Sequence, residues 1–266
     1  MRKLNNKSWI EVIARFGYAS KGVVYFIVGL LAMPVAFGIG DTAAGTSDAL
    51  QIIVTQPFGK FLLTVVAVGL TSYAAWRFIQ AFLDPEHQSS NIKRLVPRLG
   101  YAISGISYAS LAFTAVQIIA GAGGDHSSWR QDWTALLLAQ PFGQVLLAIA
   151  GAIVMGIGNA YACVAFTAKF RQRLQLTKMS DVHVKWAIGI GRFGVTARGV
   201  AFGVIGLLLI QSAVQSDPDE VQGLGGTLQT LAEEPFGQGL LSVIALGFVA
   251  YAIHLLILAW YRRIRI

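Results

Sequence analysis

A tripeptide, Pro-Phe-Gly, occurs three times in this chain, each time between a polar segment and a long apolar run. The copies are Pro57, Phe58 and Gly59; Pro141, Phe142 and Gly143; and Pro235, Phe236 and Gly237. An Arg-x-Gly start precedes each copy, and the distance from its glycine to the proline is 40, 41 and 41 residues. Internal repetition at a fixed period indicates that one structural unit has been used three times.

The three units also share positions next to the Arg-x-Gly start. In each unit a second glycine lies five residues after the first glycine, and an aromatic residue lies eight residues after the first glycine. These pairs are Gly22 and Tyr25, Gly105 and Tyr108, and Gly199 and Phe202. The copies differ in places, because Lys21 and Ser104 stand where the third copy has Arg198. We divide a single membrane domain, 1–266, into repeats at about 10–90, 91–180 and 181–266.

Composition places these units in a membrane. The chain is 55% hydrophobic and only 13% charged, whereas soluble domains have about 25% charged residues. Six apolar runs, each near the length that crosses about 30 Å of hydrocarbon as a helix, lie at 22–40, 61–83, 99–121, 143–168, 199–215 and 237–260. These runs are apolar on every side, so they do not fit the alternating strands of a barrel. The expected fold class is all-α, a polytopic bundle of six transmembrane helices from three parallel two-helix repeats.

Short segments before each Pro-Phe-Gly, at 47–55, 133–140 and 227–233, carry apolar residues at helical spacing, among them Leu50, Ile53 and Leu228. We predict short amphipathic helices at the outer interface of the membrane. Because proline suits the first turn of a helix, we also predict that Pro57, Pro141 and Pro235 open the second membrane helix of each unit. The following glycine is expected to let the interfacial helix approach closely.

Basic residues fall on one side of this topology. All of the 21 Lys and Arg residues except Lys60 and Arg130 lie on the side of the two termini, whereas most acidic residues lie opposite. An excess of basic residues marks the cytoplasmic side, so both termini are predicted to be cytoplasmic. The formal charge of +8 is then a topology signal, and we expect no nucleic-acid partner. The basic and apolar start resembles a signal peptide, but it belongs to the threefold series, so we expect no cleavage.

These motifs resemble a bacterial family of three-repeat, six-helix membrane proteins that is catalogued as domain of unknown function 1206. The residues that carry the resemblance are the Arg-x-Gly-Tyr start, the stretches 197–202 and 217–224, and Pro-Phe-Gly followed by Ala-x-Gly-x-x-x-Tyr. Val195 replaces the tyrosine in the third copy. The resemblance implies the fold, the topology and a bacterial cytoplasmic or internal membrane, and it implies no activity.

Four arginines are candidate contacts for a phosphate or an anionic lipid: Arg15, Arg98, Arg192 and Arg198. A guanidinium suits bidentate contact with phosphate. The alternative is that these arginines anchor helix ends, as Arg77 does in this interpretation, with Trp76 and Trp260 in the interfacial belt. The paired small residues Gly199 and Gly203 are expected to allow close helix packing, and a ligand-lining role is the alternative.

His254 is the one histidine inside an apolar run, so it is a weak candidate for a cofactor ligand, against the alternative of a hydrogen-bonded or interfacial residue. No cofactor and no metal are predicted. The single cysteine, Cys163, excludes an intramolecular disulfide and a thiolate cluster.

No Asp or Glu lies deep in the six apolar runs, and the chain has no phosphate-binding glycine loop and no hydrolase or metalloprotease motif. We therefore expect no enzyme. The first hypothesis is a membrane scaffold or accessory subunit that binds another membrane component, a lipid or a membrane protein. The alternative is a small-solute channel or carrier along the pseudo-threefold axis.

Overall fold

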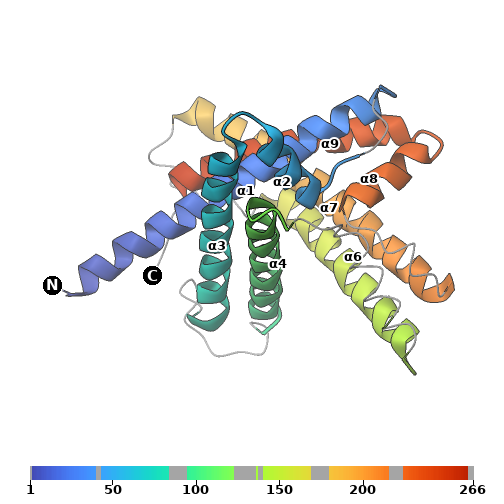
Figure 1. The fold of residues 1–266 in the computed structure, drawn as a ribbon, viewed down its shortest axis with the longest axis horizontal. Coiled ribbons are helices and arrows are strands. Elements are labelled where there is room, and N and C mark those ends of the chain that lie inside the picture. The colour runs from blue at the N-terminus through green and yellow to red at the C-terminus, as the bar shows by residue number, and fades with distance from the viewer. Residues whose placement is uncertain are drawn as a thin grey trace.

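The structure is a computed structural model that describes residues 2–39, 43–83, 95–122, 136, 140–168, 180–215 and 224–262. Within these ranges the chain is helical and has no strand (Figure 1). Six helices are long and apolar enough to cross a membrane: α1 (Arg2–Ala36), α3 (Gly59–Leu83), α4 (Leu95–Ile119), α6 (Gly143–Thr167), α7 (Asp181–Gln215) and α9 (Gly237–Tyr261). The expected all-α fold with three two-helix repeats is confirmed.

Helices α1 and α7 are longer than the apolar runs predict, at 35 residues each. The predicted runs began at Gly22 and Gly199, directly after Lys21 and Arg198, so these starts lie too late in the chain. Both helices continue through the basic residue, and both cations are buried inside the protein.

The Pro-Phe-Gly corners are turns, which corrects the prediction that proline opens the second helix. In each copy the glycine N–H donates to the carbonyl three residues before it, at 2.7 Å for Gly59 to Gln56, and the helix itself starts at the glycine. The phenylalanine between them has positive φ, 59° at Phe58, 87° at Phe142 and 66° at Phe236. These features match a type II turn, with proline at its second position and a left-handed third position.

The predicted interfacial helices at 47–55 and 227–233 are α2 (Thr46–Thr55) and α8 (Leu224–Glu233). Each buries apolar residues on one side, including Leu50 and Leu228. A Cβ on Gly59 would overlap the backbone carbonyls that end α2, so the corner glycine allows the expected close approach. The predicted helix at 133–140 lies largely outside the described residues.

The membrane helices pack as three pairs, α1 with α9, α3 with α4, and α6 with α7. Each pair joins the first helix of one repeat to the second helix of the preceding repeat in cyclic order. The second glycines of the starts lie at these pairings: Gly22 against Ala252, Gly105 against Phe78 and Gly199 against Gly158. The pairs point in different directions, so the helices splay (Figure 1).

The two membrane helices of one repeat pack against each other in the first and third repeats, but not in the second. A Cβ on Gly17 would lie 2.7 Å from the Cα of Tyr73, and Gly194 lies equally tightly against Tyr251, so α1 packs on α3 and α7 on α9. The matching Gly100 has no neighbour within 4 Å. Correspondingly, α4 and α6 do not pack against each other as one of the packed pairs of described helices. The pseudo-threefold arrangement is therefore open at the second repeat.

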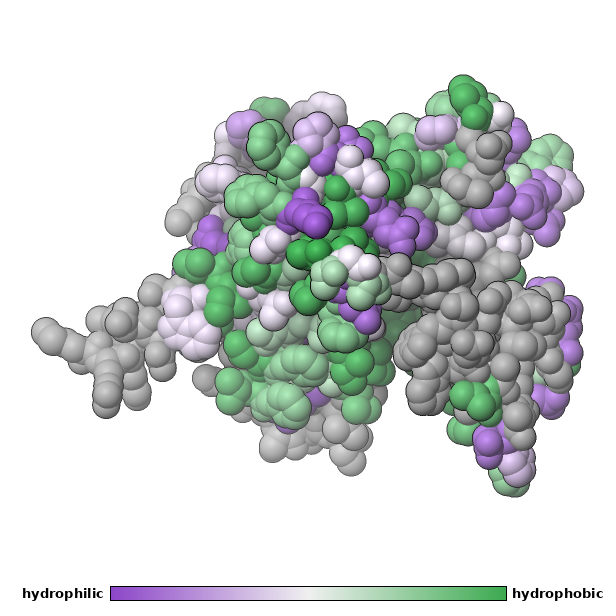
Figure 2. Space-filling model, viewed as in Figure 1, coloured by the Kyte–Doolittle hydropathy of each residue, from purple (hydrophilic) through white to green (hydrophobic). Residues whose placement is uncertain are grey.

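Hydrophobic side chains cover much of the outer surface. In the view of Figure 2 they gather over the lower part of α3 and α4. On α4 and α6, Ile106, Phe113 and Ile153 are all exposed. An apolar exterior of this kind suits helices that face lipid.

Candidate functional site

Three basic side chains meet in the interior, from three different helices. Lys21 of α1 is 2% exposed and Arg198 of α7 is 4% exposed, and Arg77 of α3 joins them with a half-buried side chain. We call these residues the cationic cluster. Charged side chains are almost never fully buried unless they are paired, so the surroundings of this cluster decide what it can do.

Lys21 lies among tyrosines. Its ammonium Nζ donates to the hydroxyl of Tyr73 at 3.1 Å. The same nitrogen lies 4.6 Å from the ring centroid of Tyr108 and 4.7 Å from that of Tyr73, with Tyr251 and Tyr25 at 5.6 and 5.8 Å. These are cation–π distances, each contributing about 0.5–2 kcal/mol. Lys21 is therefore held by neutral partners.

Arg198 is held in the same way. Its guanidinium donates to the hydroxyls of Tyr251 and Tyr108, the second at 3.4 Å. The guanidinium carbon is within 5.2 Å of four ring centroids, those of Tyr25, Tyr161, Phe202 and Tyr251. Its Nε has no hydrogen-bond partner. One donor of a buried guanidinium is thus unsatisfied.

Arg77 binds the same phenol oxygen as Lys21. Its Nε donates to the hydroxyl of Tyr73 at 2.9 Å, and Nη1 donates to Oε1 of Gln80 at 3.0 Å. Arg77 is therefore part of the interior cluster and is no simple helix-end anchor. The neighbouring Trp76 is fully buried, with the guanidinium of Arg262 5.7 Å from its ring, so its predicted place in an interfacial belt was wrong.

The repeat brings these residues together. Lys21 and Arg198 occupy equivalent positions in their units, as do Tyr25, Tyr108 and Phe202, and so do Tyr73 and Tyr251. A helix that carries a cation four residues after the first glycine and an aromatic four residues later presents both on one face. Two such faces meet at the centre of the bundle, with α4 supplying Tyr108.

No carboxylate in the described part of the chain neutralises the positive charge of the cationic cluster. Glu11 pairs with Arg15 at 2.6 Å, Oδ2 of Asp48 accepts from the amide of Gly45, and Glu233 accepts from Gln229. None of these carboxylates contacts Lys21, Arg77 or Arg198. The arrangement is a positively charged interior with aromatic walls.

A cavity of about 410 Å³ adjoins Arg198. Its lining includes Tyr25, Tyr108 and Phe202 beside Arg198, three hydroxyl residues of α4, and the first turn of α2. The α4 residues are Ser107, Ser110 and Thr114, and the α2 residues are Thr46 and Ser47. The cavity thus lies between the first turn of α2 and the middle of the membrane helices, and it is rich in hydrogen-bonding groups.

The arginines of the three starts are not brought together. Arg15 donates to the carbonyl of Trp260 at 2.7 Å, at the end of α9, and Arg192 donates to the carbonyl of Phe166 at 3.4 Å, in the last turn of α6. Arg98 is half-buried in the first turn of α4. Arginine near the C-terminal carbonyls of a helix is favourable. Arg15 and Arg192 have a structural role of this kind, and lipid contact by these residues stays a prediction.

The remaining sequence candidates lie elsewhere. His254 is buried in α9, and no group of three His, Cys, Asp or Glu side chains suited to a metal occurs among the residues that the structure describes. Cys163 is exposed on α6. Gly199 packs against Gly158 of α6, as expected of a helix-packing residue.

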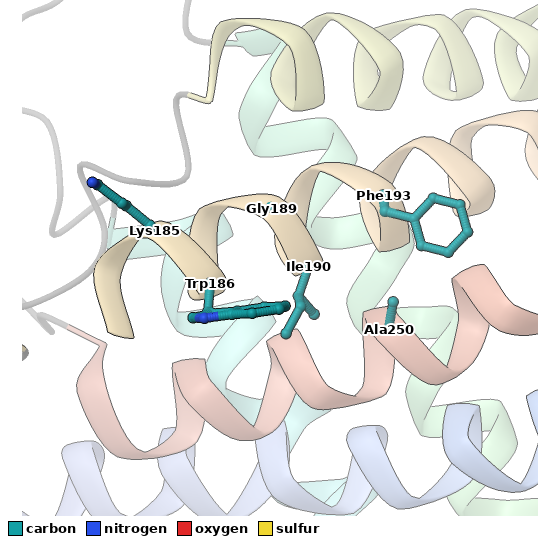
Figure 3. A pocket seen from close by; sticks show the side chains of 6 residues that line it. All are labelled: Lys185, Trp186, Gly189, Ile190, Phe193 and Ala250. Atoms are coloured by element: carbon teal, nitrogen blue, oxygen red, sulfur yellow. The ribbon is translucent and has the colours of Figure 1, made fainter. Parts of the chain in front are cut away.

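A second cavity, of about 400 Å³, lies between α7 and α9 and is mainly apolar. It is lined by Lys185, Trp186, Gly189, Ile190, Phe193 and Ala250. Figure 3 shows the indole of Trp186 beside Ile190, with Lys185 directed away from the other side chains. Lys185 is the single charged residue in its lining, so this cavity has few groups that could bind a polar ligand.

The sequence could have indicated the cationic cluster through one signal, the equivalence of Lys21 and Arg198 in the aligned repeats. Arg77 gave no such signal, because the matching positions are Tyr161 and Leu255. Only the packing of α1, α3 and α7 shows that three cations share one site.

Six apolar helices in three two-helix repeats define a polytopic helical membrane protein. The model of the family described as Domain of Unknown Function (DUF1206) matches residues 16–84, 99–168 and 193–262, and the chain belongs to this family. It is also similar to the uncharacterized protein YxxB of Bacillus subtilis (strain 168), at 34% identity over 252 residues, which cover 95% of this chain and 91% of that protein. No solved structure matches the chain.

Proposed function

We propose that this protein is a non-enzymatic membrane protein that binds an anionic component of the membrane inside its helix bundle. One observation carries the proposal: Lys21 and Arg198 are buried side by side, and no carboxylate in the described ranges pairs with them. A basic side chain at the centre of a membrane helix costs roughly 2.5–3.5 kcal/mol. Tyrosine rings offset part of that cost, and a bound anion would offset more.

A channel or carrier along the pseudo-threefold axis is the alternative. The rings of Tyr73 and Tyr108 meet edge to face at 4.7 Å, and those of Tyr25 and Tyr251 at 5.0 Å. These rings surround the cations and fill the space between the helices. Such filling favours a closed binding site over an open pore. It also agrees with a role in which the protein holds a membrane component without transforming it.

Native mass spectrometry tests the proposal. The full chain is placed in nanodiscs of mixed phosphatidylglycerol and phosphatidylcholine, and the lipids that stay bound after release are identified. We expect wild-type protein to retain the anionic lipid preferentially. The double variant Lys21→Met, Arg198→Met should lose that preference, because methionine keeps much of the volume and removes the charge.

Lys60→Met is the matched control, since Lys60 is an exposed cation outside the cluster. It should leave the preference for anionic lipid unchanged. Equal retention of both lipids by wild-type protein, or an unchanged preference in the double variant, would overturn the proposal. Arg198→Lys, which keeps the charge, shows whether loss of binding reflects loss of charge or loss of the fold.

A further inference from the structure

We infer that the cavity next to Arg198 is a binding site for a phosphate-bearing group, the head group of a lipid or a small organic phosphate. The inference rests on the proposed function and adds the place and the chemistry of the ligand. Arg198 lines the cavity and is nine-tenths buried, and its Nε has no hydrogen-bond partner. A buried guanidinium with a donor to spare is the first requirement for an oxyanion site.

The hydroxyls of the cavity supply further donors. The Tyr108 hydroxyl accepts from Arg198 and is also hydrogen-bonded to Tyr25, so it is not counted as a donor to a ligand. Ser110 and Thr114 lie four residues apart along α4 and line the same wall. The hydroxyl of Ser107 already donates to the carbonyl of Ile103, so we assign it no donor role. The wall therefore offers neutral donors beside one cation.

The first turn of α2 also lines the cavity, through Thr46 and Ser47. The amides of a first helical turn have no partner within the helix. The positive end of the helix dipole adds a favourable field for an anion. Asp48 opposes this field, but its carboxylate is exposed and accepts from the amide of Gly45. The charge of the cavity is consequently set by Arg198, with Lys21 behind it.

The volume indicates the size of the ligand. At about 410 Å³ the cavity falls in the range of small-molecule pockets, about 300–1,000 Å³. A bare phosphate ion leaves much of that space empty, whereas a glycerophosphate group occupies more of it. The unpaired Nε–H of Arg198 would donate to one oxygen of such a group, and the guanidinium charge would strengthen that hydrogen bond. Because hydrogen-bonding groups line the cavity from Arg198, from α4 and from α2, a tetrahedral phosphate, which accepts from several directions, suits it better than a planar carboxylate.

The experiment has two arms that separate the sources of the phosphate. In the first, glycerol 3-phosphate is titrated into detergent-purified protein at constant ionic strength, and its dissociation constant is measured by calorimetry. In the second, retention of phosphatidylglycerol is measured from nanodiscs. Binding in the first arm identifies a soluble organic phosphate, and binding in the second alone identifies a lipid head group.

The deciding variant fills the cavity and leaves the cationic cluster intact. Ser110→Leu, Thr114→Leu should weaken binding by about tenfold or more in whichever arm shows it, as expected when charge-assisted contacts are lost. Ser72→Leu on α3 lies outside the cavity and should change binding little. The inference is overturned if neither arm shows binding, or if the filled cavity binds as well as wild type. If binding survives there but fails in Lys21→Met, Arg198→Met, the proposed function stands and only this site is wrong.

Discussion

The ammonium of Lys21 and the guanidinium of Arg77 both donate to the hydroxyl oxygen of Tyr73, at 3.1 and 2.9 Å. A phenol oxygen has two acceptor sites, and here two cations from different helices use them. Tyr73 also packs against Gly17 at the α1–α3 contact. One tyrosine thus joins the packing of the first repeat to the buried charges at the centre.

Tyr73→Phe should destabilise the protein by about 1.5–3 kcal/mol, because it removes the acceptor of the charge-assisted hydrogen bonds from Lys21 and Arg77 and keeps the ring. Thermal unfolding in mild detergent, followed by circular dichroism, measures the change. Tyr161→Phe is the matched control, since Tyr161 contacts Arg198 through its ring. Similar losses in both variants would show that the hydroxyl of Tyr73 has no special role.

Substitution of the first glycines should separate the closed repeats from the open one. Gly17→Ala and Gly194→Ala place a Cβ against the backbone of Tyr73 and Tyr251, and overpacking of this kind costs about 1–3 kcal/mol. Gly100→Ala meets no neighbour within 4 Å and should change stability by no more than about 0.5 kcal/mol. Denaturation midpoints of the three variants provide the comparison. A loss for Gly100→Ala as large as the others would show that the second repeat closes.

The left-handed phenylalanine of the corner should be a site of stored strain. Phe142 has φ of 87° and is 82% exposed, so its side chain offers little packing against the protein. A left-handed L-residue costs roughly 1–2 kcal/mol, and glycine avoids that cost. Phe142→Gly should therefore raise the melting temperature in detergent, and Phe142→Val should lower it. If Phe142→Gly lowers it too, contact of the ring with the amphiphile outweighs the strain.

Arg15→Ala should loosen the junction of α1 with the end of α9. The side chain donates to the carbonyl of Trp260 and pairs with Glu11, and part of it is solvent-exposed. We expect a loss of about 0.5–1.5 kcal/mol, the usual net value of such a hydrogen bond. Hydrogen exchange of the last turn of α9 should speed up, while that of α6 stays unchanged. Arg15→Lys, which keeps the charge and loses the planar fork, should recover only part of the stability.

Cysteine labelling tests the predicted orientation. In a Cys163→Ser background, Lys60→Cys and Lys185→Cys place one thiol each on opposite sides, at residues that are exposed in the structure. A membrane-impermeant maleimide added to intact cells should label the first and spare the second until the membrane is opened. The reverse pattern would show that the termini lie outside, against the distribution of basic residues.

The fold was largely predictable from the sequence, and the site was not. Apolar runs of membrane length and the spacing of Gly22, Gly105 and Gly199 indicate six helices in three units, because helix formation in lipid depends on local composition. Lys21 and Arg198 fell just outside the predicted apolar runs, which began at Gly22 and Gly199. Their hydrogen-bond partners lie on other helices. Lys21 donates to Tyr73, 52 residues away, and Arg198 donates to Tyr108 and Tyr251, 90 and 53 residues away. No pattern along the chain encodes those pairings.

By itself, the sequence determined the threefold unit, its two membrane helices, and the polar corner that joins them through Pro-Phe-Gly. Tertiary structure alone decided that proline and phenylalanine form a turn before the helix, with the phenylalanine in the left-handed region. It also decided that α4 and α6 stay apart and that three cations meet among tyrosines. The physical reason is the range of the interactions. Hydrophobicity and helix propensity act over neighbouring residues, whereas the cost of a buried charge depends on whatever groups the packed helices place around it.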